Sequence, residues 1–126
     1  MQMSKLCTAN GIHYYHFLQP NQYLENSKLI NSKEQKIAFE LNGTRRNNIQ
    51  YCYPILRNEG RRLQNNGVNF CDLTMIFSNE NRTLYTDDCC HINYLGNKIM
   101  ADAIADYIMQ SLKSELEQSL FTKHCL

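Results

Sequence analysis

Two short runs of apolar residues predict buried β-strands. The first, IHYYHFL at 12–18, is rich in aromatic residues and stops at Gln19-Pro20. The second, VNFCDLTMIF at 68–77, contains a turn signal, DLT at 72–74, where the strand is expected to end. Neither run alternates cleanly between apolar and polar positions, which is typical of parallel strands covered on both faces.

Two segments between these runs have the features of helices. SKEQKIAFEL at 32–41 carries Ser32 and Gln35 at capping-box spacing ahead of apolar residues, which predicts a short helix. A second helix is predicted to begin near Pro54, because proline suits the first helical turn. Gly67 is placed to end it.

A longer helix is predicted after Asn93, which is a suitable N-cap. Its apolar positions recur at helical spacing: Leu95, Ile99, Ala103, Ile104, Tyr107, Ile108, Leu112 and Leu116.

The order of these elements predicts the fold class. Strand, helices, strand and helix imply right-handed crossovers and a parallel sheet, and therefore an α/β protein. The 126 residues are enough for one domain. Two parallel strands, however, expose too much edge and bury too little face for a stable layered domain. We therefore expect the sequence to be part of a larger α/β domain.

Composition excludes several classes of partner. The formal net charge of +1 gives no electrostatic case for binding nucleic acid or an anionic membrane. No window approaches the roughly 18 apolar residues of a membrane span, and residues 1–12 lack the apolar core of a signal peptide. The six cysteines form no CxxC pair. Without a secretory signal they indicate reduced thiols, and hence a cytoplasmic location.

The sequence DDCCH at 87–91 carries the clearest candidate chemistry. It lies between the second strand and the last helix, where ligands gather beyond the carboxyl ends of parallel strands. An aspartate close to His91 can accept the imidazole Nδ1–H and leave Nε2 free to take a proton from a nucleophile. Asp88 has the spacing for this role, and Asp87 is the alternative if the loop is bulged. A helix-entry loop with acids near the helix N-terminus and a surface histidine explains the same residues without catalysis.

Other candidate sites are weaker. The contiguous Cys-Cys-His at 89–91 lacks the spacing that lets ligands converge on zinc, so no metal or cofactor is predicted. His13 and His16 are three apart on the first strand and are expected to face opposite sides of the sheet. Arg45 and Arg46 are expected on a solvated face.

Three segments resemble, in the right order, blocks of the SGNH/GDSL hydrolases. DDCCHINYLGNKIMADAIADYI at 87–108 resembles the last conserved block, in which D-x-x-H precedes an asparagine, a glycine and a helix. GIHYYHFLQPNQYL at 11–24 resembles a strand and turn with an L-Q-P signature. YPILRNEGRRLQNNGVNFCDLTMIF at 53–77 is similar to the helix and strand that follow.

This resemblance implies both a fold and a set of roles. Residues 1–126 would be the C-terminal portion of a single SGNH hydrolase-like domain, a flavodoxin-like three-layer α/β/α fold of which only the last strands and helices are present. Asp88 and His91 would be the acid and base of a Ser-His-Asp triad acting on carboxylic esters. Gln19, in the L-Q-P signature, would line the substrate pocket; its alternative is a turn residue bonded to the backbone.

The sequence departs from the family at the nucleophile. The G-D-S serine, and the glycine and G-x-N-D asparagine of the oxyanion hole, do not occur in this sequence. Ser78 is the only serine between the second strand and the acid pair, and no nucleophile elbow surrounds it. The resemblance thus implies a fragment that is inactive alone and acts on a small-molecule ester once an N-terminal half completes it. The alternative is a non-catalytic remnant or interaction module that pairs with such a half or with itself.

Overall fold

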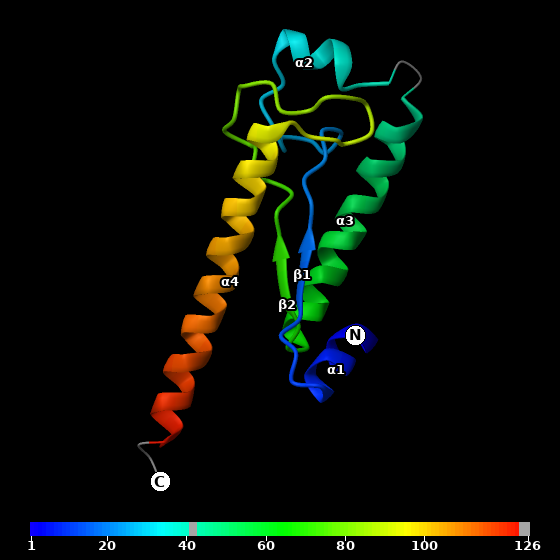
Figure 1. The fold of residues 1–126 in the computed structure, drawn as a ribbon. Helices are drawn as coiled ribbons and strands as arrows, with labels where there is room; N and C mark the ends of the chain where they lie inside the picture. The colour runs from blue at the N-terminus through cyan, green and yellow to red at the C-terminus, as the bar shows by residue number, and fades with distance from the viewer. Residues whose placement is uncertain (41–42, 124–126) are drawn as a thin grey trace.

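The computed structural model describes residues 1–40 and 43–123 (Figure 1). The elements follow the order α1 (Gln2–Ala9), β1 (Tyr15–Leu18), α2 (Ser32–Ile37), α3 (Thr44–Asn65), β2 (Asn69–Asp72) and α4 (Tyr94–Lys123). The protein is therefore a mixed α/β structure, as predicted. Among the described residues no helix combines the length and the apolar character needed to cross a membrane.

β1 and β2 form a two-stranded parallel sheet, which confirms the predicted pairing. Tyr15 lies opposite Asn69, and Leu18 lies opposite Asp72. Both strands are shorter than the apolar runs that predict them. β2 ends because the Asp72 carboxylate accepts hydrogen bonds from the backbone N–H (3.0 Å) and the hydroxyl (2.6 Å) of Thr74. These bonds form the exit turn that the sequence predicted.

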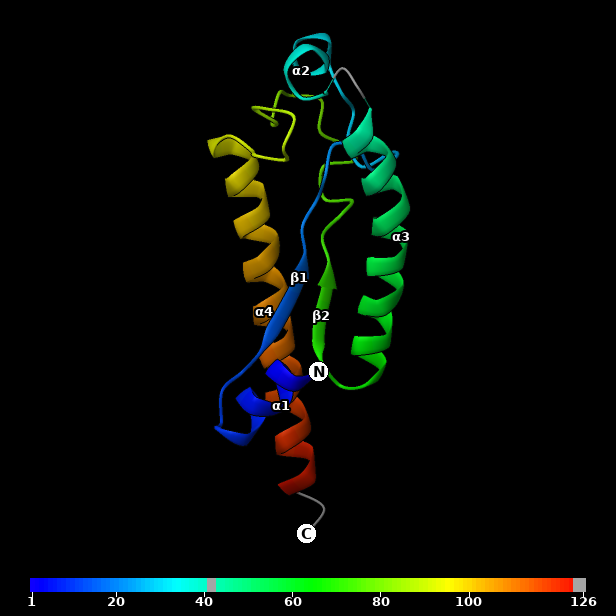
Figure 2. The same ribbon diagram turned by 90° about the vertical axis from the view of Figure 1, so that its right-hand side faces the viewer.

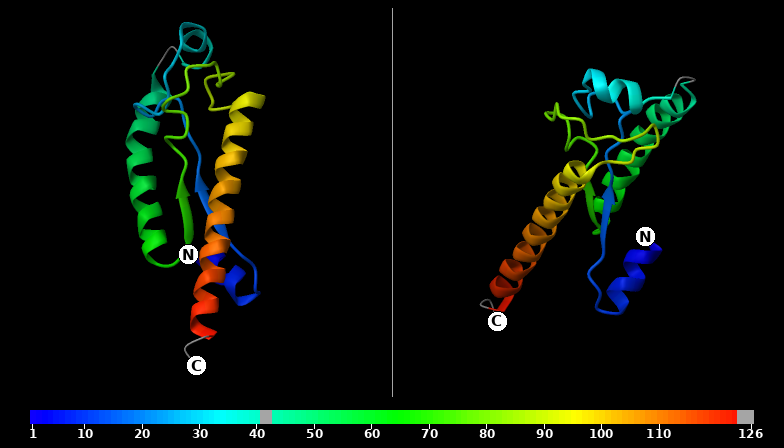
Figure 3. Two further views of the ribbon diagram at one scale, coloured as in Figure 1. Left: turned by 90° about the vertical axis from the view of Figure 1, so that its left-hand side faces the viewer. Right: turned by 45° about the horizontal axis from the view of Figure 1, so that its top comes forward.

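The helices α3 and α4 lie on opposite sides of the sheet (Figures 2 and 3). α3 approaches β2 so closely that a Cβ atom on Gly60 would lie 2.0 Å from Cζ of Phe70. On the other side the Tyr107 hydroxyl of α4 donates a hydrogen bond to the Phe70 carbonyl (3.0 Å). The Tyr107 ring also packs edge-on against Tyr15 and Phe17.

α3 is longer than the predicted helix and does not begin at Pro54. It begins at Thr44, so Pro54 lies inside it, and the prediction of a first-turn proline is wrong. The first turns of α3, residues 44–48, are exposed and polar and therefore show no apolar stripe in the sequence. Its end was predicted: Gly67 has a left-handed φ of 79°, and Val68 N–H bonds to the Leu63 carbonyl (3.1 Å).

α2 uses a different cap from the predicted one. The Asn31 side chain accepts from the backbone N–H groups of Lys33 (3.1 Å) and Glu34 (2.9 Å), so the Ser32–Gln35 capping box is wrong. The helix ends at Ile37, and residue 41, where the predicted helix ends, lies outside the described residues.

The last predicted helix is confirmed, and a first helix was not predicted. The Asn93 side chain accepts from Gly96 N–H (3.0 Å) as expected of an N-cap. α4 continues past the lower ends of the strands (Figure 1), which leaves Leu116 64% exposed despite its place in the apolar stripe. α1 buries none of its residues.

The main hydrophobic core lies beyond the carboxyl ends of the strands. Its fully buried members are Ala38, Phe77, Leu84 and Tyr85, and partly buried hydrophobic residues pack around them: Ile30, Phe39, Ile76, Ile92, Leu95 and Ile99. This cluster joins the segments on either side of residues 86–91. It therefore supports the loop that carries the candidate chemistry.

Candidate functional site

The loop of residues 86–91 is closed at its base by backbone contacts. Tyr85 and Ile92 form an antiparallel bridge, and Thr86 N–H donates to the His91 carbonyl (2.9 Å). Cys90 adopts a left-handed conformation with φ of 69°, which is unfavourable for a residue with a side chain. The loop is thus the bulged form, and its bulge turns His91 back toward the start of the loop.

Asp87, not Asp88, is the partner of His91. Asp87 Oδ2 lies 2.5 Å from His91 Nδ1, and Asp87 Oδ1 accepts from the backbone N–H of Cys89 (2.8 Å). These hydrogen bonds, that of His91 above all, lower the pKa of the Asp87 carboxyl below its usual range. The carboxylate therefore accepts the Nδ1–H of His91 and leaves Nε2 available.

Asp88 instead pairs with Arg45 at the start of α3. Arg45 Nη1 lies 2.5 Å from Asp88 Oδ1 and 2.9 Å from the Asp88 carbonyl oxygen, which also accepts from the Tyr23 hydroxyl (3.1 Å). The hydrogen bond with Asp88 raises the pKa of the Arg45 guanidinium. The assignment of Asp88 as the partner of the histidine is thereby corrected: this residue fastens the loop to α3.

His91 and Gln19 line the same cleft, and the role of Gln19 in binding substrate stays a prediction. The cleft has a volume of about 360 Å³ and is lined by Gln19, Pro20, Cys90, His91, Ile92, Asn97 and Met100. The His91 side chain is 71% exposed. The Gln19 amide donates to the Cys90 sulfur at 3.6 Å. The turn after β1 and the loop after β2 therefore meet beyond the carboxyl ends of both strands, in agreement with the general rule for open α/β sheets.

The described residues that line the cleft offer no activated nucleophile. They include no serine or threonine, and Ser78 is not among them. Cys90 is present, but burial raises the pKa of its thiol, and Cys89 and Asp87 act in the same direction. Since the thiolate is the reactive form, Cys90 is a poor nucleophile here.

The described part of the chain also contains no group of three or more His, Cys, Asp or Glu side chains able to hold a metal ion. Cys89 is exposed and Cys90 half-buried, and both are free thiols, as are Cys7, Cys52 and Cys71. Cys125 lies outside the described residues.

Two residues after the L-Q-P signature support the loop and were not predicted. The Gln22 amide donates to the carbonyl oxygens of Ala38 (3.1 Å) and Asp87 (3.2 Å), and the Tyr23 hydroxyl reaches Asp88. Their position next to Gln19-Pro20 was the available signal in the sequence.

Comparisons of the chain with protein-family models, curated proteins and solved structures give no match. The relationship to the SGNH/GDSL hydrolases therefore stays a prediction that rests on the three sequence segments.

Proposed function

We propose that this chain supplies the acid–base part of an SGNH/GDSL-type hydrolase that acts on carboxylic esters. The observation that carries the proposal is the 2.5 Å contact between Asp87 Oδ2 and His91 Nδ1, made by a histidine that is exposed at a cleft. An orienting carboxylate, an imidazole and a space beside the imidazole for substrate are three of the requirements of acyl transfer by a serine hydrolase.

The proposed mechanism assigns a distinct step to each residue. Asp87 holds His91 with its proton on Nδ1, and Nε2 takes the proton of a serine hydroxyl as the oxygen attacks the ester carbonyl. The imidazolium, stabilised by Asp87, then gives this proton to the leaving alkoxide. A water molecule, activated by the same Nε2, releases the acid and regenerates the serine.

The serine and the oxyanion-binding donors are assigned to a different segment or polypeptide. The lining of the cleft supports this assignment, because its described residues contain no hydroxyl nucleophile. Preorganised oxyanion donors are usually the largest single contribution to such catalysis. We therefore expect little turnover by this chain alone. In the completed enzyme the two parallel strands would continue into a larger sheet, giving the three-layer fold that the resemblance implies.

Hydrolysis of p-nitrophenyl acetate tests this proposal. The chain alone is expected to show background rates, and a mixture with an N-terminal half that carries a G-D-S serine is expected to hydrolyse the ester. His91→Ala should lower the rate of the mixture by about 10³-fold or more. His16→Ala is the matched control, because this exposed histidine stacks on Phe70 away from the cleft and its loss should leave the rate unchanged. Full activity of the mixture with His91→Ala would refute the proposed role.

A second candidate is a non-catalytic interaction module that pairs with a separate N-terminal half or with itself. The exposed apolar residues of α3 favour it: Tyr51 is 74% exposed and Ile55 is 49% exposed, and their spacing places both on one face of the helix. The sheet also has only two strands in the described residues, so each strand has an unpaired outer edge.

A further inference from the structure

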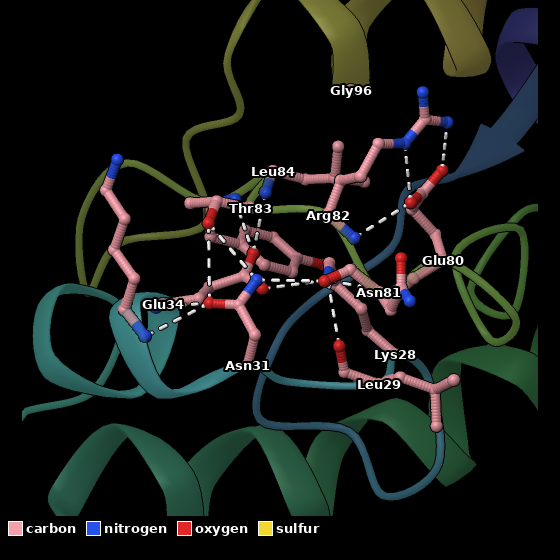
Figure 4. A network of polar contacts seen from close by, with 12 residues as sticks. Lys28, Leu29, Asn31, Glu34, Glu80, Asn81, Arg82, Thr83, Leu84 and Gly96 are labelled. Carbon is pink, nitrogen blue, oxygen red and sulfur yellow. Dashed lines mark hydrogen bonds and ion pairs between the residues drawn. The ribbon is translucent and has the colours of Figure 1, made fainter.

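A buried ion pair between Lys28 and Glu34 lies close to Leu84, just before the loop of residues 86–91 (Figure 4). Lys28 Nζ is 2.8 Å from Glu34 Oε2, and both side chains are fully buried. The lysine directs its hydrogen bonds to the carbonyl oxygens of Leu29 (3.0 Å) and Glu80 (3.1 Å), so its contact with the carboxylate is mainly electrostatic. Burying two charges is costly even when they are paired, and such a pair therefore calls for a reason beyond stability.

The other carboxylate oxygen of Glu34, Oε1, makes contacts that indicate a positioning role. Glu34 Oε1 accepts hydrogen bonds from the backbone N–H groups of Leu84 (2.9 Å) and Tyr85 (2.7 Å). These residues immediately precede the loop, and a charged acceptor makes stronger bonds than a neutral one. Glu34 thus fixes the chain two residues before Asp87.

The same backbone segment is connected to the other end of the loop. Tyr85 is bridged to Ile92, and Asn93 N–H donates to the Leu84 carbonyl (2.8 Å). The Asn93 side chain donates to the Thr83 carbonyl (2.7 Å), and Asn31 holds Thr83 from the α2 side (3.1 Å). A displacement of residues 84–85 therefore moves both Asp87 and His91.

From these contacts we infer that Glu34 is a positioning residue that sets the contact between Asp87 and His91. Its importance for catalysis rests on the proposed ester hydrolysis, whereas its effect on the contact does not. Lys28 neutralises the buried carboxylate and holds it in place from the opposite side.

NMR of the protein with isotope-labelled histidine and aspartate tests the contact between Asp87 and His91 directly. In the unaltered chain neutral His91 should carry its proton on Nδ1. Glu34→Asp keeps the charge near Lys28 but is one methylene shorter, so it withdraws the acceptor from both amides. Glu34→Gln keeps the length but places a neutral group there. In both variants His91 should lose the Nδ1–H form in favour of Nε2–H, which free imidazole side chains prefer, and the pKa of Asp87 should rise toward its ordinary value.

Arg57→Gln is the matched control. It breaks the partly buried ion pair between Arg57 and Asp72 (2.6 Å), which joins α3 to the end of β2. This variant should lower the unfolding midpoint without changing the His91 tautomer or the Asp87 titration. A folded Glu34 variant in which the His91 tautomer and the Asp87 titration are both unchanged would overturn the inference.

If neither Glu34 variant folds, hydrogen exchange of the unaltered chain tests whether Glu34 holds the backbone before the loop. The Leu84 and Tyr85 amides should be protected to the same degree as the amides of the α3 interior, and rapid exchange at these two positions would overturn the inference. None of these measurements needs an ester substrate. A chain with a Glu34-dependent contact but no activity with an N-terminal half would contradict only the proposed function.

Discussion

At the scale of single residues, the assignment of roles within the Asp87–Asp88 pair depends on one backbone conformation. The sequence favoured Asp88 because of its spacing and kept Asp87 as the partner in a bulged loop. The left-handed φ of Cys90 creates that bulge. Because Cys90 is neither glycine nor asparagine, the residue types that usually signal such a conformation, the sequence could not decide between the two acids.

Substitution of each acid in turn distinguishes their roles. Asp87→Asn should remove the acceptor of the His91 Nδ1–H, shift neutral His91 to the Nε2–H form, and lower ester hydrolysis by the completed enzyme about 10⁴-fold. Asp88→Asn is the matched change on the adjacent residue. It weakens a half-exposed pair with Arg45 and should lower the rate less than tenfold, with the His91 tautomer retained. NMR of the chain alone measures the tautomer, and the p-nitrophenyl acetate assay measures the rate. A larger effect at Asp88 than at Asp87 would reverse the assignment.

At the scale of elements, three predictions based on local chemistry agree with the structure, whereas the Ser32–Gln35 capping box and the first-turn position of Pro54 do not. The stop at Gly67, the turn at Asp72 and the cap at Asn93 depend on contacts within a few residues, and all three are present. The start of α3 was missed because its first turns, residues 44–48, are polar and solvent-exposed, so nothing in their pattern separates them from a loop. Glu34 was missed for a different reason: its partners Leu84 and Tyr85 are distant in sequence.

The contact between α3 and β2 gives a prediction about stability. Glycine inside a helix ordinarily costs up to about 1 kcal/mol relative to alanine, so Gly60→Ala would stabilise an isolated helix. Here the added Cβ would lie 2.0 Å from the Phe70 ring, and the overpacking should destabilise the protein by about 1–3 kcal/mol instead. Urea unfolding measures the change.

A compensating substitution provides the control for Gly60. Gly60→Ala combined with Phe70→Leu should lose less stability than the sum of the two single changes, because the smaller side chain makes room for the new methyl group. Additive losses, or a stabilising Gly60→Ala, would show that α3 and β2 do not pack as closely as described.

At the scale of the whole molecule, the order of elements predicted the parallel sheet and its flanking helices, but pattern alone could not place the core. Phe70 and Tyr53 are buried where α3 packs on the sheet, whereas the fully buried cluster of Ala38, Phe77, Leu84 and Tyr85 lies beyond the strand ends. Its members come from loops and helix ends, which show no periodic signal. The consequence is a sheet that remains open at its edges while the region of the acid–histidine loop is well packed.

Such an arrangement predicts self-association of the isolated chain. The outer edges of β1 and β2 are unpaired in the described residues, and the Tyr51–Ile55 face of α3 exposes apolar surface to solvent. Light scattering should therefore show a mass above that of the monomer that increases from low to high micromolar concentration.

Tyr51→Lys combined with Ile55→Lys should shift the chain toward the monomer, because two charges cannot be buried in an apolar contact. Tyr94→Lys changes a tyrosine at the start of α4 that is even more exposed and should leave the mass unchanged. If the unaltered chain stays monomeric at every concentration, neither the strand edges nor this helix face mediates pairing between copies. Of the two partners considered, a second copy and a separate N-terminal half, only the N-terminal half would then remain.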